Sequence, residues 1–254
     1  MVRGAPGADG TKGVAVAEGV HARMLARLGT SIVEGTLPPG SVLRLEELQE
    51  RFGASRTVAR EVVRALETMG LTESRRRVGV TVRAPGHWNH YDPRLIRWQL
   101  DGRTRTEALR VLTELRRAVE PTAAGLAAHR ATAAQRTRLR ELGTLLATTA
   151  KARDLDTFLR HDVAFHHLLL TASGNPMFGQ LSEVVREVLA GRTGHGLMPP
   201  EPEPEAVALH LEVAEAVHAG DAPRAERAMR DIVVQAGTEM NVLLDSAPGA
   251  PGGN

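Results

Sequence analysis

Residues 45–82, LEELQERFGASRTVAREVVRALETMGLTESRRRVGVTV, determine the predicted fold of the amino-terminal third of the chain. Apolar residues recur at helical spacing at the start of this stretch, until Gly53 interrupts the pattern. Ser55 is a favourable N-cap for a second helix, whose apolar stripe continues until Gly70 ends it. Two short strands then flank three consecutive arginines. The whole stretch therefore predicts a winged helix-turn-helix.

The second predicted helix carries its basic residues on one face. Arg56, Arg60 and Arg64 are spaced four apart, opposite the apolar stripe. A short helix with one buried face and arginines on the other fits the major groove of DNA. A solvated surface helix could show the same ladder. The capped turn before it and the basic hairpin after it, with Arg75–Arg77 at the tip, favour contact with DNA.

The composition of the chain indicates a helical core and excludes several kinds of site. The chain has 254 residues, of which 42% are hydrophobic but only 3% are aromatic, so the core must consist mainly of Leu, Val and Ala. This composition favours packed helices over a β-sandwich. There is no cysteine, which excludes disulfides, thiolate zinc sites and cysteine nucleophiles.

The distribution of charge and of apolar residues indicates a cytoplasmic nucleic-acid-binding protein. Residues 1–85 hold 13 Lys and Arg against 9 Asp and Glu, whereas residues 86–254 hold 19 against 21. A basic front half joined to a mildly acidic back half suits a DNA-binding module attached to a second domain. No apolar run reaches the roughly 18 residues of a membrane span, and the amino terminus lacks an apolar signal-peptide core. We therefore expect a cytoplasmic location and no membrane contact.

The pattern of breaks predicts a mainly α protein with two folded domains. The expected segments are a disordered N-terminus at 1–13, the winged helix-turn-helix at 14–83, a linker at 84–104, a helical effector-binding domain at 105–245 and a disordered tail at 246–254. The linker holds both tryptophans and the only tyrosine. Within the second domain we expect antiparallel helices near 107–130, 133–151, 154–173, 177–191, 204–219 and 221–244.

Polar residues occupy core positions on the helices of the second domain. Asp162 and His166 interrupt the apolar stripe of helix 154–173, and His210 interrupts the stripe of a later helix. An unpaired buried carboxylate costs several kcal/mol, so it needs a partner. Asp and His four residues apart can chelate one cation, with His210 as a third ligand. Taken alone, this spacing more often marks a hydrogen-bonded pair than a metal site. Arg116 flanks the inward face of its helix, either as a ligand clamp or as a salt-bridge partner of Glu120.

Several segments together resemble one family of regulators. LPPGSVL (37–43), LQERFGASRTVAREVVRALETMGL (48–71) and the RRRVGVTV wing resemble the winged-helix domain of the GntR family. Three further segments resemble the FadR subgroup of that family, whose effector domain is the FCD domain. They are LRRAVEPTAAGLAA (115–128), DVAFHHLLLTASGNPMF (162–178) and HLEVAEAVHAGDAPRAERAMR (210–230). The predicted linker, WNHYDPRLIRWQLDG, is similar to that of the branch of the family that responds to sugar acids.

The resemblance implies which residues contact DNA. Arg56 and Arg60 match the arginines of the family's recognition helix. An arginine that some members carry early in the second helix is replaced here by Glu46, and the nearby Arg44 is the candidate to substitute for it. The full set that we expect at the DNA interface is Arg44, Ser55, Arg56, Thr57, Arg60, Arg64, Arg75, Arg76 and Arg77.

The resemblance also implies a metal and effector site. Asp162, His166 and His210 match three of the four usual ligand positions for a divalent metal such as zinc, whereas the fourth, usually a histidine, is Ile232. The site is then either a three-ligand site completed by water or effector, or a pocket without metal. Arg116 matches an arginine that faces the carboxylate of the effector. The effector-binding set is therefore Arg116 together with the three candidate metal ligands.

These observations predict a transcriptional regulator, a repressor and not an enzyme. We expect a homodimer on a short palindrome of double-stranded DNA, controlled by a small carboxylate, most simply a sugar acid such as gluconate or galactonate. One alternative is a metal-dependent enzyme that carries a DNA-binding domain, but no convincing general base accompanies the candidate ligands. Another is a regulator that senses an acyl thioester, which would need a long apolar tunnel instead of a polar cluster.

Overall fold

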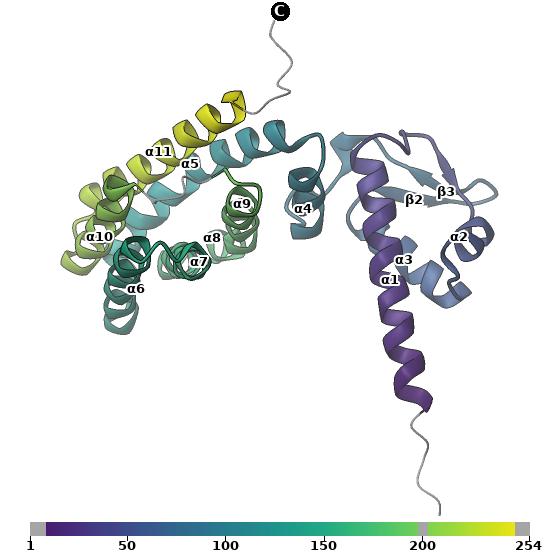
Figure 1. Cartoon of the computed structure of the whole chain (residues 1–254), viewed down its shortest axis with the longest axis horizontal. Helices are drawn as coiled ribbons and strands as arrows, with labels where there is room; N and C mark the ends of the chain where they lie inside the picture. The colour runs from purple at the N-terminus through teal and green to yellow at the C-terminus, as the bar shows by residue number, and fades with distance from the viewer. Residues whose placement is uncertain (1–8, 198–202, 247–254) are drawn as a thin grey trace, which may run out of the picture. The chain divides into compact units, whose positions relative to one another are not determined.

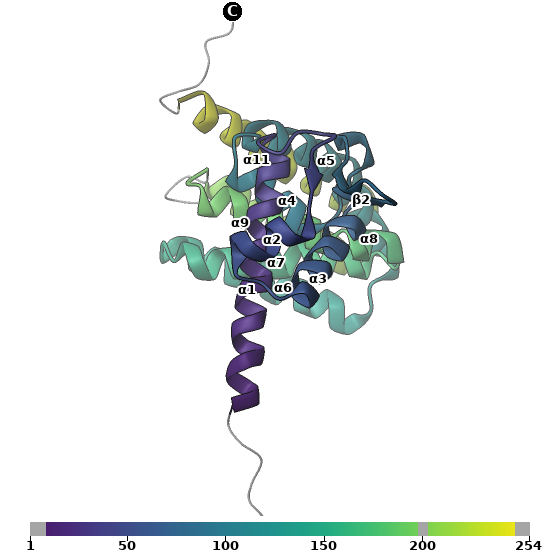
Figure 2. The same cartoon turned by 90° about the vertical axis from the view of Figure 1, so that its right-hand side faces the viewer.

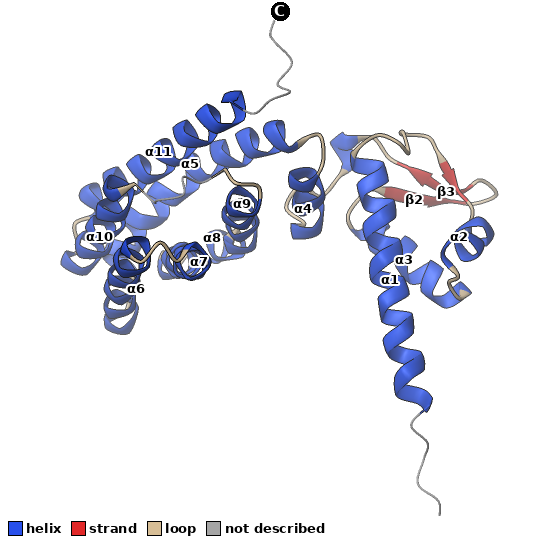
Figure 3. Ribbon diagram, viewed as in Figure 1, coloured by secondary structure: helices blue, strands red, loops and turns tan. Residues whose placement is uncertain are grey.

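The computed structural model describes residues 9–197 and 203–246, and the chain divides into two compact units between Thr104 and Arg105 (Figure 1). The strands belong to the first unit, and the described part of the second unit is helical (Figure 3). The predicted fold class, a winged helix-turn-helix followed by a helical bundle, is confirmed. Within the described residues, no helix is long and apolar enough to cross a membrane.

The first unit combines helices with a small antiparallel sheet. Its elements are α1 (Asp9–Val33), β1 (Val42–Leu43), α2 (Leu45–Phe52), α3 (Arg56–Thr68), β2 (Thr72–Arg75), β3 (Gly79–Val82), the 3-10 helix η1 (Pro85–His87) and α4 (Pro93–Asp101). The strand order is β1-β3-β2. Helix α1 packs beside both α3 and α4, as two perpendicular views show (Figures 1 and 2).

The helix-turn-helix forms where the sequence predicts it. Gly53 adopts the left-handed backbone conformation (φ 62°, ψ 35°) that ends α2. The Ser55 hydroxyl then accepts the backbone N–H of Val58 at 3.3 Å and caps α3. Strand β1 was not predicted; it pairs with β3 through Val42 opposite Thr81. A two-residue strand is too short to leave an alternating pattern.

The ends of the chain and the expected linker differ from the prediction. Helix α1 begins at Asp9, inside the segment expected to be disordered, and α11 reaches Ser246; residues 1–8 and 247–254 lie outside the described residues. The expected linker, 84–104, includes helix α4, which belongs to the first unit. Its Trp98 is 8% exposed and joins the core of that unit, because the apolar face of α4 packs on α1.

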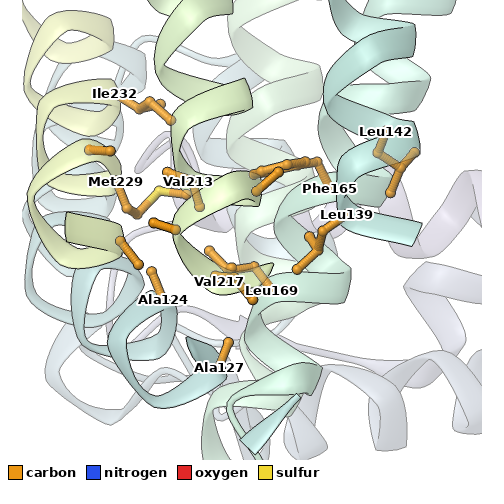
Figure 4. Close-up of a cluster of buried hydrophobic side chains, with 14 of the residues drawn as sticks. Ala124, Ala127, Leu139, Leu142, Phe165, Leu169, Val213, Val217, Met229 and Ile232 are labelled. Carbon is orange, nitrogen blue, oxygen red and sulfur yellow. The ribbon is translucent and has the colours of Figure 1, made fainter. Parts of the chain in front are cut away.

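The second unit is a bundle of α5 (Arg105–Arg130), α6 (Ala133–Lys151), α7 (Leu155–Ala172), α8 (Pro176–Gln180), α9 (Ser182–Gly194), α10 (Pro204–Ala219) and α11 (Ala222–Ser246). Helix α11 packs along α5, α10 packs against α6 and α11, and α7 contacts α5, α6 and α9. Aliphatic residues and Phe165 fill the core between these helices (Figure 4). The single helix expected at 177–191 is two helices, α8 and α9.

The close contact between α1 and α4 yields a stability prediction. A Cβ added at Gly29 would lie 2.2 Å from Cζ3 of Trp98, so Gly29→Ala forces α4 away from α1. Overpacking of this kind costs about 1–3 kcal/mol of unfolding free energy. Both tryptophans, Trp88 and Trp98, lie in the first unit, so denaturation followed by tryptophan fluorescence measures that unit alone.

Gly19→Ala is the matched control for this substitution. Gly19 lies on the same helix, and nothing lies within 4 Å of a Cβ added there. This change should be neutral or stabilising by up to about 1 kcal/mol, because alanine has the higher helix propensity. If the two variants unfold at the same denaturant concentration, Gly29 and Trp98 are not in the close contact described here.

Candidate functional site

The predicted DNA-binding residues all lie on the surface of the first unit. Helix α3 buries one face, formed by Val58, Ala59, Val62, Val63 and Leu66, in the core. Every member of the predicted DNA-binding set is exposed. The three arginines of α3 make no ion pair within the part of the chain that the structure describes. Their guanidinium groups are therefore available to an outside anion.

The wing is attached to the recognition helix by side-chain contacts. The Ser74 hydroxyl of β2 donates a short hydrogen bond to the Glu67 carboxylate of α3. Arg75 pairs with Glu73 at 2.5 Å, and Arg77 turns the hairpin with a φ of 67°. Arg44, just before α2, is held by Glu47 at 3.4 Å, so it must leave this weak exposed pair to contact a phosphate.

In the second unit, three helices bring five ionisable side chains together in the core. Helix α5 contributes Arg116 and Glu120, α7 contributes Asp162 and His166, and α10 contributes His210. All five are buried, and Glu120 is fully buried. The predicted convergence of the aspartate and the two histidines is therefore observed, together with a second carboxylate.

Arg116 and Glu120 form the salt bridge that was the alternative role for this arginine. Arg116 Nε donates to Glu120 Oε1 at 2.6 Å, and Nη2 donates to Oε2 at 3.3 Å. Nδ1 of His166 lies 2.7 Å from the same Oε2. Glu120 thus lies between a guanidinium and an imidazole, on the far side of His166 from Asp162.

The aspartate and the two histidines present atoms that are close together but not hydrogen-bonded. Asp162 Oδ1 lies 3.4 Å from Nε2 of His166 and 3.2 Å from Nε2 of His210. Asp162 Oδ1 and His210 Nε2 are buried and have no hydrogen-bond partner within the described residues. One ligand atom from each of the three residues lies within 4.8 Å of the others. Atoms arranged in this way fit a shared cation better than mutual hydrogen bonds.

The surroundings of both histidines favour the same interpretation. Nδ1 of His210 is 2.7 Å from the carbonyl oxygen of Ala206, to which it donates when Nε2 is the unprotonated nitrogen. Glu120 Oε2 lies 2.7 Å from Nδ1 of His166, although this close contact lacks hydrogen-bond geometry. Histidine ligands of metals are commonly oriented by a carbonyl or carboxylate on the opposite ring nitrogen. Ile232 is 4% exposed and belongs to the apolar core, so it provides no ligand (Figure 4).

The charges of the cluster shift the pKa values of Glu120, His166 and Asp162. Burial alone would raise the pKa of Glu120, but the charges of Arg116 and His166 outweigh burial and lower it to about 2. Burial would lower the pKa of His166, whereas the charge of Glu120 and the contact with Asp162 raise it to about 9. Burial also opposes ionisation of Asp162, yet the two histidines hold its pKa well below its usual range. Without a cation, a proton on His166 therefore balances the cluster at neutral pH.

The cluster opens onto a cavity of about 50 Å³, enough for a few water molecules or a small group. Asp162, His166 and His210 line this cavity, and so does Arg116. Further charged residues of the wall, Arg192, Glu203 and Glu239, were not predicted as site residues. Arg192 was missed because the predicted helix ended at residue 191, whereas α9 continues to Gly194.

Comparison with known proteins identifies the family. Residues 21–82 match the family described as bacterial regulatory proteins, gntR family, and residues 111–235 match the FCD domain. The chain is 31% identical over 208 residues to the galactonate operon transcriptional repressor of Escherichia coli K12, which covers 81% of this chain and 90% of that protein. The chain belongs to the GntR family of bacterial regulatory proteins.

Other relatives agree with this assignment. The HTH-type transcriptional regulator LutR of Bacillus subtilis is 30% identical over 165 residues, which are 62% of this chain and 70% of that protein. The structure of E. coli McbR/YncC has a TM-score of 0.51 at 19% identity, over 89% of this chain and 98% of that chain, and supports the fold. A GntR helix-turn-helix implies DNA binding, and an FCD domain implies a small-molecule effector. The relatives are regulators, which argues against the enzyme alternative.

The buried ion network yields a second stability prediction. Glu120→Gln removes the charge that faces both Arg116 and His166, and should cost about 3–5 kcal/mol of unfolding free energy, because it leaves a buried guanidinium unpaired. Far-UV circular dichroism during urea unfolding, with a metal chelator present, measures this loss. Glu141→Gln is the control, because its pair with Arg138 is about half exposed and should contribute less than about 1 kcal/mol. Equal losses in the two variants would show that the buried network does not stabilise the fold.

Proposed function

We propose that this GntR regulator is a homodimeric repressor that binds a short DNA palindrome and releases it when a small carboxylate binds the second unit. A sugar acid such as gluconate or galactonate is the proposed effector. The observation that carries the proposal is the cavity lined by the buried side chains of Asp162, His166, His210 and Arg116. The similarity to the galactonate operon repressor of E. coli supports the choice of effector class.

A divalent cation such as zinc is proposed to be held by Asp162, His166 and His210. Their buried atoms without partners fit a cation, and Ile232 leaves a coordination position for water or effector. With neutral histidines, two carboxylates and one arginine leave the cluster with one negative charge. A divalent cation reverses that charge. A single carboxylate then restores neutrality, which favours a small anion as the effector.

Arg116 is proposed to contribute to the effector site through the N–H groups that Glu120 leaves unused. A guanidinium has five N–H donors, and Glu120 takes those of Nε and Nη2. The small volume of the cavity argues against an acyl-thioester effector, because a long acyl chain needs an extended apolar tunnel.

Control of DNA binding requires the effector to prefer one arrangement of the dimer. An effector that bound the DNA-bound and free forms equally well would change nothing. Coupling of about 1–3 kcal/mol between two such sites is ordinary. A two-fold symmetric dimer places two recognition helices on two half-sites of DNA, from which we propose a palindromic operator.

The arginine ladder predicts a loss of specific DNA affinity in Arg60→Ala. Arg60 is exposed and central in the ladder on α3, and losing one bidentate base contact costs about 1–3 kcal/mol. Fluorescence anisotropy with a duplex selected in vitro against the wild-type protein measures the change. Arg138→Ala, an exposed arginine of the second unit, is the control and should bind like the wild type.

Arg76→Ala separates base contacts from phosphate contacts. Arg76 is exposed at the wing, so its removal should weaken selected and random duplexes alike and reduce the salt slope by about 0.9 for one phosphate contact. Unchanged affinity of Arg60→Ala for the selected duplex would show that α3 does not present the recognition face.

The proposed metal site predicts that His166→Ala loses the response to effector. The variant should purify without zinc and should bind the selected duplex normally, while galactonate no longer weakens that binding. Elemental analysis and anisotropy titrations provide the two measurements. His167→Ala, whose side chain is exposed on the same helix, is the matched control. Ile232→His should retain zinc more tightly, because it supplies a fourth ligand. If the wild type purifies without metal and galactonate still weakens DNA binding by His166→Ala, the cluster is only a hydrogen-bonded polar core and not an effector site.

A further inference from the structure

Arg192 is a buried arginine whose hydrogen bonds are incomplete. It lies on α9 and is 6% exposed, at the wall of the cavity. Its Nε has no hydrogen-bond partner within the described residues. Its nearest anion is Glu239 of α11, whose Oε2 lies 3.5 Å from Nη2. A charge-assisted hydrogen bond is shorter, about 2.7–2.9 Å. The buried guanidinium therefore lacks the close anion that its burial demands.

The two arginines of the cavity differ in how well they are neutralised. Arg116 is bound by Glu120 through two hydrogen bonds, the shorter of 2.6 Å. Within the described residues, the one ion pair of Arg192 is its long contact with Glu239, whose Oε1 is itself buried without a hydrogen-bond partner. The charge of Asp162 also acts on Arg192. Both groups of the second pair are thus poorly satisfied. Arg192 keeps its charge at neutral pH, because its pKa, lowered by burial and by the charge of Arg116, is still about 10.

We propose that Arg192 supplies the positive charge that binds the carboxylate of the effector, and that Glu239 occupies this place as an internal competitor until the effector arrives. The inference rests on the proposed function, a carboxylate-responsive regulator. A carboxylate in the cavity can accept N–H bonds from Nε and Nη2 of Arg192 together, the bidentate geometry that guanidinium groups favour. Arg116, already paired, is left for weaker contacts with hydroxyl groups.

The release of Glu239 is physically reasonable. Its side chain is 21% exposed in the pair, so the displaced carboxylate can turn to water. Burial raises the pKa of Glu239, and the charge of Glu203, which also lines the cavity, raises it further, whereas Arg192 and Gln235 oppose this shift. When the effector replaces Glu239, Arg192 exchanges a long ion pair for a shorter one. The partly buried Glu239 carboxylate then becomes hydrated, and both changes favour binding of the effector.

The exchange also provides a mechanical link within the second unit. Arg192 is on α9 and Glu239 is on α11, so their ion pair bridges two helices. Helix α11 packs along α5, the first helix after the boundary between the two units. An effector that takes Arg192 from Glu239 removes a contact between α9 and α11. The effector therefore prefers a different arrangement of these helices, as control by a ligand requires.

Isothermal titration calorimetry of the zinc-loaded, full-length protein tests this inference, with acetate, D-gluconate and D-galactonate as probes. Glu239→Gln removes the competitor, so the Kd of a bound probe should fall about 2- to 10-fold, the range of a partly exposed ion pair. Arg192→Leu should raise Kd about 10- to 100-fold, because a hydrogen bond to a charged group is lost. Glu203→Gln is the matched control, an exposed glutamate of the same wall, and should change Kd less than Glu239→Gln.

The outcomes separate this inference from the proposed function. If none of the three probes binds the wild type or Glu239→Gln, the carboxylate-effector function fails and the inference with it. If a probe binds the wild type but Glu239→Gln binds it equally or more weakly, the competitor role of Glu239 is overturned and the proposed function stands. Arg192→Lys, which keeps the charge without the planar fork, should bind more weakly than the wild type. If Arg192→Lys and Arg192→Leu both bind the probe with the Kd of the wild type, the proposed role of Arg192 is overturned.

Discussion

The burial of Asp162 is the constraint on which the second unit depends. A carboxylate that is 7% exposed must be neutralised at close range, since an uncompensated buried charge costs several kcal/mol. Two histidines from different helices face it, and Glu120 and Arg116 support one of them from a third helix. The packing of α5, α7 and α10 is thus tied to one electrostatic requirement, which a proton or a cation can meet.

This constraint explains why a sensor can be built into a helical core. An apolar core of the same volume would be at least as stable, but it would not respond to an ion or an anion. Here the charges are nearly but not fully balanced, and Arg192 and Glu239, each with a buried atom that lacks a hydrogen-bond partner, lie at the cavity wall. The proposed carboxylate effector would complete the balance. Helix α5 then provides a covalent route from this site to the first unit, because it begins immediately after the boundary at Arg105.

Local signals in the sequence predicted much of the structure, and long-range contacts account for what was missed. The bounds of α6 and α10 agree with the prediction, because Thr132 caps the first and the left-handed Gly220 ends the second. The convergence of Asp162, His166 and His210 followed from helical periodicity. The contact of Glu120 with His166 depends on how α5 crosses α7, and the docking of α4 depends on how Trp98 meets Gly29. Both contacts join residues on different helices, so no local sequence pattern predicts them.

The proposed function requires the cavity in the second unit and the DNA-binding face of the first to be thermodynamically linked. The most direct measurement is the Kd of the zinc-loaded protein for D-galactonate, determined with and without saturating amounts of the selected duplex. Linkage requires DNA to weaken galactonate binding by the same factor by which galactonate weakens DNA binding. We predict equal factors of about 5 to 150, the range of ordinary coupling energies. A galactonate Kd that DNA leaves unchanged, in a protein that binds both ligands, would contradict the account.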